Sequence, residues 1–324
     1  MSKIKKFLVY FASIIFIVLP VLPILNLQNV YDWVKLHGYK PPVAVANISK
    51  ATTMNSYGQK IFYVNHPQLI GNKVTFNEDC RDNEQSIVLG CFESGKGIFI
   101  YDVQDPRLSG VHEVTAAHEM LHAAYERLSS KEKTKVDKLI QQTYKSLTDE
   151  RILKTIKSYQ DKDPESVPSE MHSIFGTEVR NLPKELEDYY KKYFNNREAI
   201  VALSEKYEQE FTRREDLVKQ YDAQLENLRS TIESNRISID QQIEQIKQDK
   251  AAMDQLLSQK NYNAYNLRVD GYNQKVNSVE SLIAQTNSLI NQYNDILNSR
   301  NSIALEQQEL IQAIDSRVSS AKSQ

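Results

Sequence analysis

The sequence predicts an α+β domain, made of a small sheet and several helices, between an N-terminal transmembrane helix and a C-terminal α-helical coiled-coil hairpin. Three observations predict this fold class. An apolar run follows several lysines at the start of the chain, short strand-like segments lie between turn residues over 60–103, and a seven-residue apolar repeat extends through the last third. These patterns divide the chain into segments 1–28, 29–195 and 196–324.

The first segment contains "FLVYFASIIFIVLPVLPIL", residues 7–25, which carries no charged residue. A helix of this length spans about 28 Å, close to the thickness of a bilayer core. Lys3, Lys5 and Lys6 precede it and favour a cytoplasmic N-terminus. A cleaved signal peptide is the alternative, but no small-residue cleavage site follows the run. We therefore expect a single-pass protein of the cell membrane whose C-terminal bulk is extracytoplasmic.

The middle segment predicts strands at 60–65, 72–77, 86–92 and 97–103, each bounded by Gly, Asn or Asp. Helices are expected from about 110, from 130, from 149, over 169–182 and over 183–194. Ser129 and Glu132 have the spacing of a capping box for the helix at 130. The only two cysteines, Cys80 and Cys91, predict one disulfide in an exported chain, with two unrelated thiols as the alternative.

The last segment is nearly free of glycine and repeats apolar residues every seven positions, which indicates a coiled coil. One column is Leu225, Ile232, Ile239, Ile246 and Met253. Two further columns are Val276, Ile283, Ile290, Leu297, Ala304 and Ile311, and Leu282, Leu289, Ile296, Ile303 and Leu310. "SQKNYNAYN", residues 258–266, interrupts the repeat and predicts a reversal into an antiparallel hairpin. A continuous rod that needs a partner chain is the alternative.

"VTAAHEMLHAAYERL", residues 114–128, places His118 and His122 one helical turn apart on the same face. Two imidazoles at this spacing can bind one Zn²⁺, and the intervening Glu119 can act as a general base. The flanking residues are uncharged, as a buried metal-binding helix requires. An amphipathic helix with two incidental histidines is the alternative. Tyr125, Tyr189 and Tyr190 are candidate donors to an oxyanion.

This HExxH motif resembles that of the zincin metallopeptidases, over roughly residues 44–194. The resemblance implies a sheet before the metal helix whose edge strand pairs with a peptide substrate, and "GIFIYDV", residues 97–103, is the candidate edge strand. No third histidine follows at metzincin spacing, so the pattern is that of a gluzincin, with a glutamate ligand from a later helix. "EMHSIFG" resembles the ligand helix of clostridial-neurotoxin-type gluzincins and favours Glu170; Glu178 and His172 remain alternatives.

The sequence and the resemblance together predict a membrane-anchored zinc metallopeptidase. Zn²⁺ held by His118, His122 and Glu170 would activate a water, with Glu119 as base, to hydrolyse a peptide bond. The expected partners are a peptide or protein substrate, the membrane, and a coiled-coil protein. A net charge of −2 excludes a general affinity for nucleic acid. Two alternatives remain open: a catalytically silent zincin-like surface scaffold acting through its coiled coil, and a zinc amidase on a cell-wall substrate.

Overall fold

The computed structural model describes residues 27–80 and 88–317. These residues form two compact units. The first unit comprises the described residues up to Gln209 together with those from Gln312 onward. The second, which we call the hairpin unit, spans Glu210–Ile311. The helices and strands are α2 (Leu27–Leu36), α3 (Val43–Ala51), α4 (Ser56–Val64), β1 (Gln68–Ile70), α5 (Lys73–Asp79), β2 (Gly90–Glu93), β3 (Gly97–Tyr101), the 3-10 turn η1 (Pro106–Leu108), α6 (Val111–Glu126), α7 (Ser130–Tyr144), α8 (Glu150–Lys162), α9 (Val167–Thr177), α10 (Lys184–Tyr190), α11 (Arg197–Ser258) and α12 (Tyr262–Ile314).

The predicted α+β class is wrong, because the described residues are mostly helical and contain a single sheet of three short strands. Two of the four predicted strands are helices. Segment 60–65 lies mainly in α4 and segment 72–77 mainly in α5. The Asn55 side chain accepts hydrogen bonds from the first backbone amides of α4, and Asn72 does the same for α5. Asparagine at these positions caps a helix as readily as it ends a strand, and here it starts a helix.

No helix within residues 27–80 and 88–317 is long and apolar enough to cross a membrane. The described residues therefore do not support the predicted transmembrane helix or the predicted single-pass membrane localisation. The segment on which that prediction rested, residues 7–25, lies outside the described residues.

The sheet has the order β1-β3-β2, with β1 parallel and β2 antiparallel to β3. The predicted edge strand, residues 97–103, is therefore the central strand, and β2 is one of the two edges. The predicted disulfide between Cys80 and Cys91 is confirmed, and it ties β2 to the end of α5.

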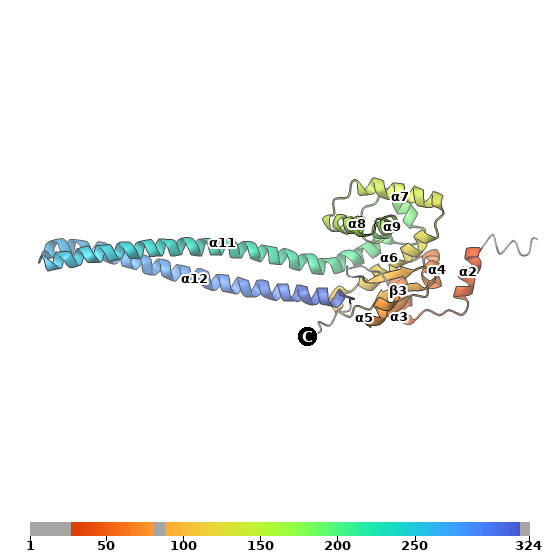
Figure 1. Ribbon diagram of the computed structural model, residues 1–324, viewed down its shortest axis with the longest axis horizontal. Coiled ribbons are helices and arrows are strands. Elements are labelled where there is room, and N and C mark those ends of the chain that lie inside the picture. The colour runs from red at the N-terminus through yellow and green to blue at the C-terminus, as the bar shows by residue number, and fades with distance from the viewer. Residues whose placement is uncertain (1–26, 81–87, 318–324) are drawn as a thin grey trace, which may run out of the picture. The chain divides into compact units, whose positions relative to one another are not determined.

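Helix α6 lies at the centre of the first unit and contacts α9, α3, α4, β2 and β3 (Figure 1). Ala116, Ala117, Ala123 and Ala124 are buried on it, and these small side chains allow close approach. The tightest contact is at Gly176 of α9, where an added Cβ would lie 2.3 Å from Leu121 Cδ1. Glycine at this position therefore brings α9 against α6.

The C-terminal end of α9 is capped by the buried Arg197 at the start of α11. Its guanidinium donates hydrogen bonds to the carbonyl oxygens of Val179 (2.6 Å) and Arg180 (2.8 Å), and it pairs with Glu187 at 2.8 Å. Unpaired carbonyls at a helix end need such donors when they are buried. Arg197 thereby fixes α9 to the rest of the first unit.

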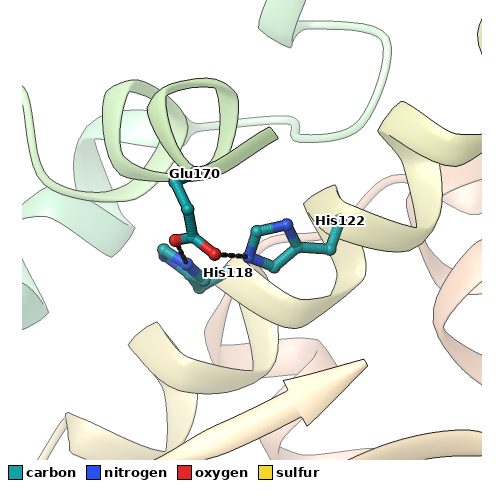
Figure 2. Close-up of side chains that lie close together, drawn as sticks. All are labelled: His118, His122 and Glu170. Carbon is teal, nitrogen blue, oxygen red and sulfur yellow. Dashed lines mark ion pairs between the residues drawn. The ribbon is translucent and has the colours of Figure 1, made fainter. Parts of the chain in front are cut away.

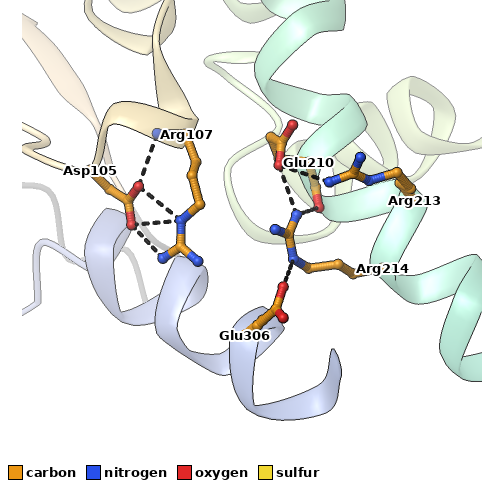
Figure 3. Close-up of polar contacts among 6 residues, drawn as sticks. All are labelled: Asp105, Arg107, Glu210, Arg213, Arg214 and Glu306. Atoms are coloured by element: carbon orange, nitrogen blue, oxygen red, sulfur yellow. Dashed lines mark hydrogen bonds and ion pairs between the residues drawn. The ribbon is translucent and has the colours of Figure 1, made fainter. Parts of the chain in front are cut away.

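The hairpin unit contains α11 from Glu210 onward and α12 up to Ile311, and the two helices run side by side over most of their length (Figure 1). Their cross-helix pairs are antiparallel: Asp222 with Arg300, Asn235 with Thr286, and Asp249 with Lys275. The chain reverses at Lys260, whose φ is 57°, so the predicted helical hairpin and its turn are confirmed. Arg214 of α11 joins Glu306 of α12 at 3.1 Å and Glu210 of its own helix at 2.8 Å (Figure 3).

Candidate metal centre

The two motif histidines lie on the face of α6 that points toward α9. Helix α6 begins after Gly110, whose φ of 108° suits glycine, and continues without interruption through the motif. His118 and His122 are partly buried, and Glu119 between them is buried. The predicted helix and the predicted one-turn spacing are therefore both present.

Helix α9 brings Glu170 close to these histidines, although Glu170 follows His122 by 48 residues in the sequence. Pro168 lies at the start of the helix, and Glu170 lies in its first turn. Glu170 Oε2 is 3.4 Å from His118 Nε2, and Glu170 Oε1 is 3.4 Å from His122 Nε2 (Figure 2). One ligand atom from each residue lies within 4.8 Å of the other two. Two imidazole nitrogens and one carboxylate oxygen form a ligand set that zinc accepts.

One oxygen of the Glu170 carboxylate lacks a hydrogen-bond partner. Its Oε2 atom is buried and makes no hydrogen bond of good geometry. Buried carboxylate oxygens are normally paired, because desolvation of an uncompensated charge costs several kcal/mol. A cation held between Glu170 and the two histidines would supply that partner, so the residues present fit a bound metal ion.

The pKa values of the two histidines in the cluster differ strongly. Burial disfavours charge on His118, but the neighbouring Glu170 outweighs burial and raises the pKa of His118 to about 9. Burial lowers the pKa of His122 to about 4. Burial also opposes ionisation of Glu170, yet the two histidines outweigh it and lower the pKa of Glu170. A metal ion would have to displace the proton that His118 holds, so metal binding should weaken in acid.

Two neighbouring side chains contact the candidate ligands. His122 Nδ1 lies 2.8 Å from Ser169 Oγ, which leaves Nε2 directed at Glu170. Tyr159 of α8 forms a hydrogen bond with the Glu170 carboxylate. Such outer contacts fix ring orientation and tautomer at metal sites. Sequence reasoning missed both residues. Ser169 directly precedes Glu170, but only the packing of α9 on α6 shows that its hydroxyl reaches His122.

The two alternative third ligands lie elsewhere. Glu178 Oε2 pairs with Arg151 Nη1 at 2.7 Å, and Glu208 approaches the same nitrogen at 3.5 Å. His172 is fully buried, and its Nε2 lies 2.8 Å from Tyr189 Oη. Burial lowers the pKa of His172 to about 3, so the ring stays neutral. Among the three candidates, the structure brings only Glu170 to the two histidines.

The candidate oxyanion donors are also engaged with other groups. Tyr125 donates to the Asp137 carboxylate at 3.1 Å. The Tyr189 hydroxyl contacts His172 and Tyr193, and Tyr190 donates to the backbone oxygen of His172. Tyr189 and Tyr190 therefore contact His172 rather than the cluster.

The cluster opens into a groove of about 1300 Å³ in the first unit. Strand β2 forms one wall, α8 and α9 form the other, and His118, Glu119, His122 and Glu170 lie along the groove. Arg151 and Tyr159, which the sequence did not single out, also line it. The wall is tight at Gly90 of β2, where an added Cβ would lie 2.4 Å from Thr115 Cγ2 and 3.1 Å from Glu119 Cγ. The edge strand therefore passes directly beside the helix that carries the motif.

The chain was compared with protein-family models, with curated proteins and with solved structures, and none of them matches it.

Proposed function

We propose that this chain is a zinc-dependent metallopeptidase of gluzincin type. One observation carries the proposal: His118 and His122 of the HExxH helix meet the carboxylate of Glu170 from a separate helix, at a groove that also contains Glu119. The first two residues alone could be a chance pattern. A carboxylate brought to both imidazoles from a separate helix supports a metal site more strongly than the motif alone.

A zinc ion held by His118, His122 and Glu170 would supply Lewis-acid activation of water and of the substrate carbonyl. The chain's own residues supply the rest. Glu119 follows His118 on α6 and lies in the same groove, where its carboxylate would accept a proton from the attacking water. The same carboxylate would then deliver that proton to the leaving amine. The buried position of Glu119 limits competition from bulk solvent.

The groove also supports a peptide as the substrate. Within the described residues, β2 pairs with β3 on one side only, and β2 lines the groove. An extended peptide added along the open side of β2 would gain backbone hydrogen bonds without a demand for particular side chains. The resemblance to zincins assigns this role to the edge strand, and the edge strand here is β2 rather than β3.

The first experiment measures zinc. The purified full chain, loaded and then desalted, should retain one zinc per chain by elemental analysis, and His118→Ala should retain little. Circular dichroism checks that the variant is folded. A folded wild type that retains no zinc would refute the metal site and, with it, the enzymatic function.

The second experiment measures hydrolysis of a peptide library by the zinc-loaded protein. Glu119→Gln should keep zinc and lose at least a hundredfold in rate, since general base catalysis contributes about 10²–10⁴-fold. Glu113→Gln is the matched control, because Glu113 lies on the same helix but not in the groove. Equal cleavage by Glu119→Gln and wild type would refute the mechanism. Stoichiometric zinc without peptide hydrolysis would favour a silent scaffold, and hydrolysis of cell-wall amides alone would favour an amidase.

A further inference from the structure

One apolar column of the hairpin unit lies beside the contact between its two helices and is only partly covered by it. The seam between α11 and α12 uses residues such as Leu225, Met253, Val279 and Leu310, which are buried. In contrast, Ile283, Ile290 and Ile311 of α12 are 37%, 38% and 41% exposed. These three belong to a column repeated every seventh residue, which we call the outer column: Val276, Ile283, Ile290, Leu297, Ala304 and Ile311.

The outer column occupies a position that a two-helix coiled coil normally fills with charged residues. Each member directly follows a position of the seam, as Ile283 follows Leu282 and Ile290 follows Leu289. Flanking positions of this kind usually carry Glu or Lys. On α11 the equivalent positions include Arg229, which follows the convention. Three apolar residues per seven, rather than two, are typical of helices in larger bundles.

We propose that the outer column of α12 is a dimerisation surface for a second copy of this chain, whose own outer column would cover it. The hairpins of the two copies would then form a four-helix bundle.

The charge of the surrounding surface favours a second copy as the occupant. Between 281 and 305, α12 contains only two charged residues, Asp295 and Arg300, and Arg300 pairs with Asp222 inside the hairpin. Glu306 is likewise paired, with Arg214 (Figure 3). This central part of the surface carries so little free charge that it neither attracts a strongly charged partner nor repels its own copy.

The residues beside the outer column can also pair with the same residues of a second copy. Four residues after members of the outer column, and therefore about one turn further along α12, lies a row of exposed amides: Asn287, Asn294, Asn301 and Gln308. An amide side chain both donates and accepts hydrogen bonds, so such a row can pair with an identical row. A twofold dimer needs this property, because the same patch contributes both sides of the interface. On α11, the basic Arg229 and Arg236 are paired with Glu226 and Glu233 of their own helix.

The size of the surface sets the expected strength. From Val276 to Ile311 the column extends about 52 Å, and a helix is about 10 Å wide. The interface would bury roughly 500 Å² per copy, or about 1000 Å² in total, which is near the lower limit for specific interfaces. We therefore expect a reversible dimer with a Kd in the micromolar range.

Sedimentation velocity of the full chain tests the dimer. The protein is measured at about 1 to 100 μM, because these concentrations span the expected Kd. The wild type should shift from monomer to dimer as its concentration rises. Ile283→Gln combined with Ile290→Gln should weaken the dimer at least tenfold. Ile237→Gln is the matched control, because Ile237 of α11 is 52% exposed but has Ser230 and Glu244 at the positions seven residues away. A monomeric wild type, or a dimer that the double variant leaves unchanged, would overturn the proposal.

A second measurement does not depend on how the double variant folds. Leu297→Cys in the full chain should form a disulfide between copies under mild oxidation, seen on a non-reducing gel. Ser302→Cys lies on the opposite side of α12 by helical periodicity and should stay largely monomeric. Equal crosslinking of the two variants would refute the outer column as the interface. If the column is instead covered by another protein, the wild type will remain monomeric and neither variant will crosslink to itself.

Discussion

Replacing Ser169 with alanine should weaken zinc binding without removing a ligand. Ser169 Oγ lies 2.8 Å from His122 Nδ1. In the tautomer that can bind a cation through Nε2, the Nδ1 proton is donated to this hydroxyl. Without the hydroxyl, the ring can rotate and can place its proton on Nε2. Loss of such a contact typically costs 10–100-fold in metal affinity, which corresponds to about 1.4–2.7 kcal/mol.

The assay is a zinc titration of the full chain against a chromophoric chelator of known affinity. Ser166→Ala is the control, because the Ser166 hydroxyl donates to the backbone oxygen of Asp163 and contacts neither histidine. Both variants remove one oxygen from the same groove. If Ser169→Ala and Ser166→Ala bind zinc equally well, the hydroxyl does not orient His122 and the reasoning fails.

Three further predictions concern stability, each measured by urea unfolding. Arg197→Ala should lower the free energy of unfolding by about 3–5 kcal/mol, because it leaves buried carbonyls at the end of α9 and Glu187 unpaired; a loss below about 1 kcal/mol would contradict this. Replacing Cys80 and Cys91 together by serine should cost about 3 kcal/mol, as expected for a short closed loop, and an unchanged midpoint would contradict it. Burial opposes ionisation of Asp32, but Arg127 and Lys60 outweigh it and lower the pKa of Asp32. The stabilisation from Asp32 is therefore present above about pH 4 and lost as the pH falls further. Wild type should lose more stability than Asp32→Asn between pH 6 and pH 3, and equal losses would refute this assignment.

Features that depend on neighbouring residues in the sequence were predictable. Ser129 and Glu132 form the capping box that their spacing predicts, with both reciprocal hydrogen bonds. The heptad repeat predicted the long helices, and the turn-prone residues around Lys260 predicted their reversal. The spacing of His118 and His122 predicted a shared helical face. In each case the interaction operates within one or two helical turns or a single turn of chain.

Features that depend on tertiary contacts were predicted poorly. Segment 60–65 is a short apolar run that ends at Asn65, as many strands do, yet Ile61 and Phe62 are fully buried in a helix, because α4 packs against α6 and α2. Sequence pattern could not order the strands either. Both partners of β3 precede it in the sequence, and β1, which pairs with it in parallel, is separated from it by α5 and β2. The third member of the site had three candidates. Only the packing of α9 decides that Glu170, and not Glu178, faces His118.

The contact at Gly176 has a consequence for how the site is assembled. Leu121 and Tyr190 pack so closely around this glycine that they set the spacing of α9 and α6. The ligand atoms therefore owe their proximity to apolar packing, and much of the entropic cost of gathering them is met when the chain folds. Small zinc modules, in contrast, fold only when the ion binds. A chelator should thus remove zinc from the proposed site and leave the protein folded and able to bind zinc again.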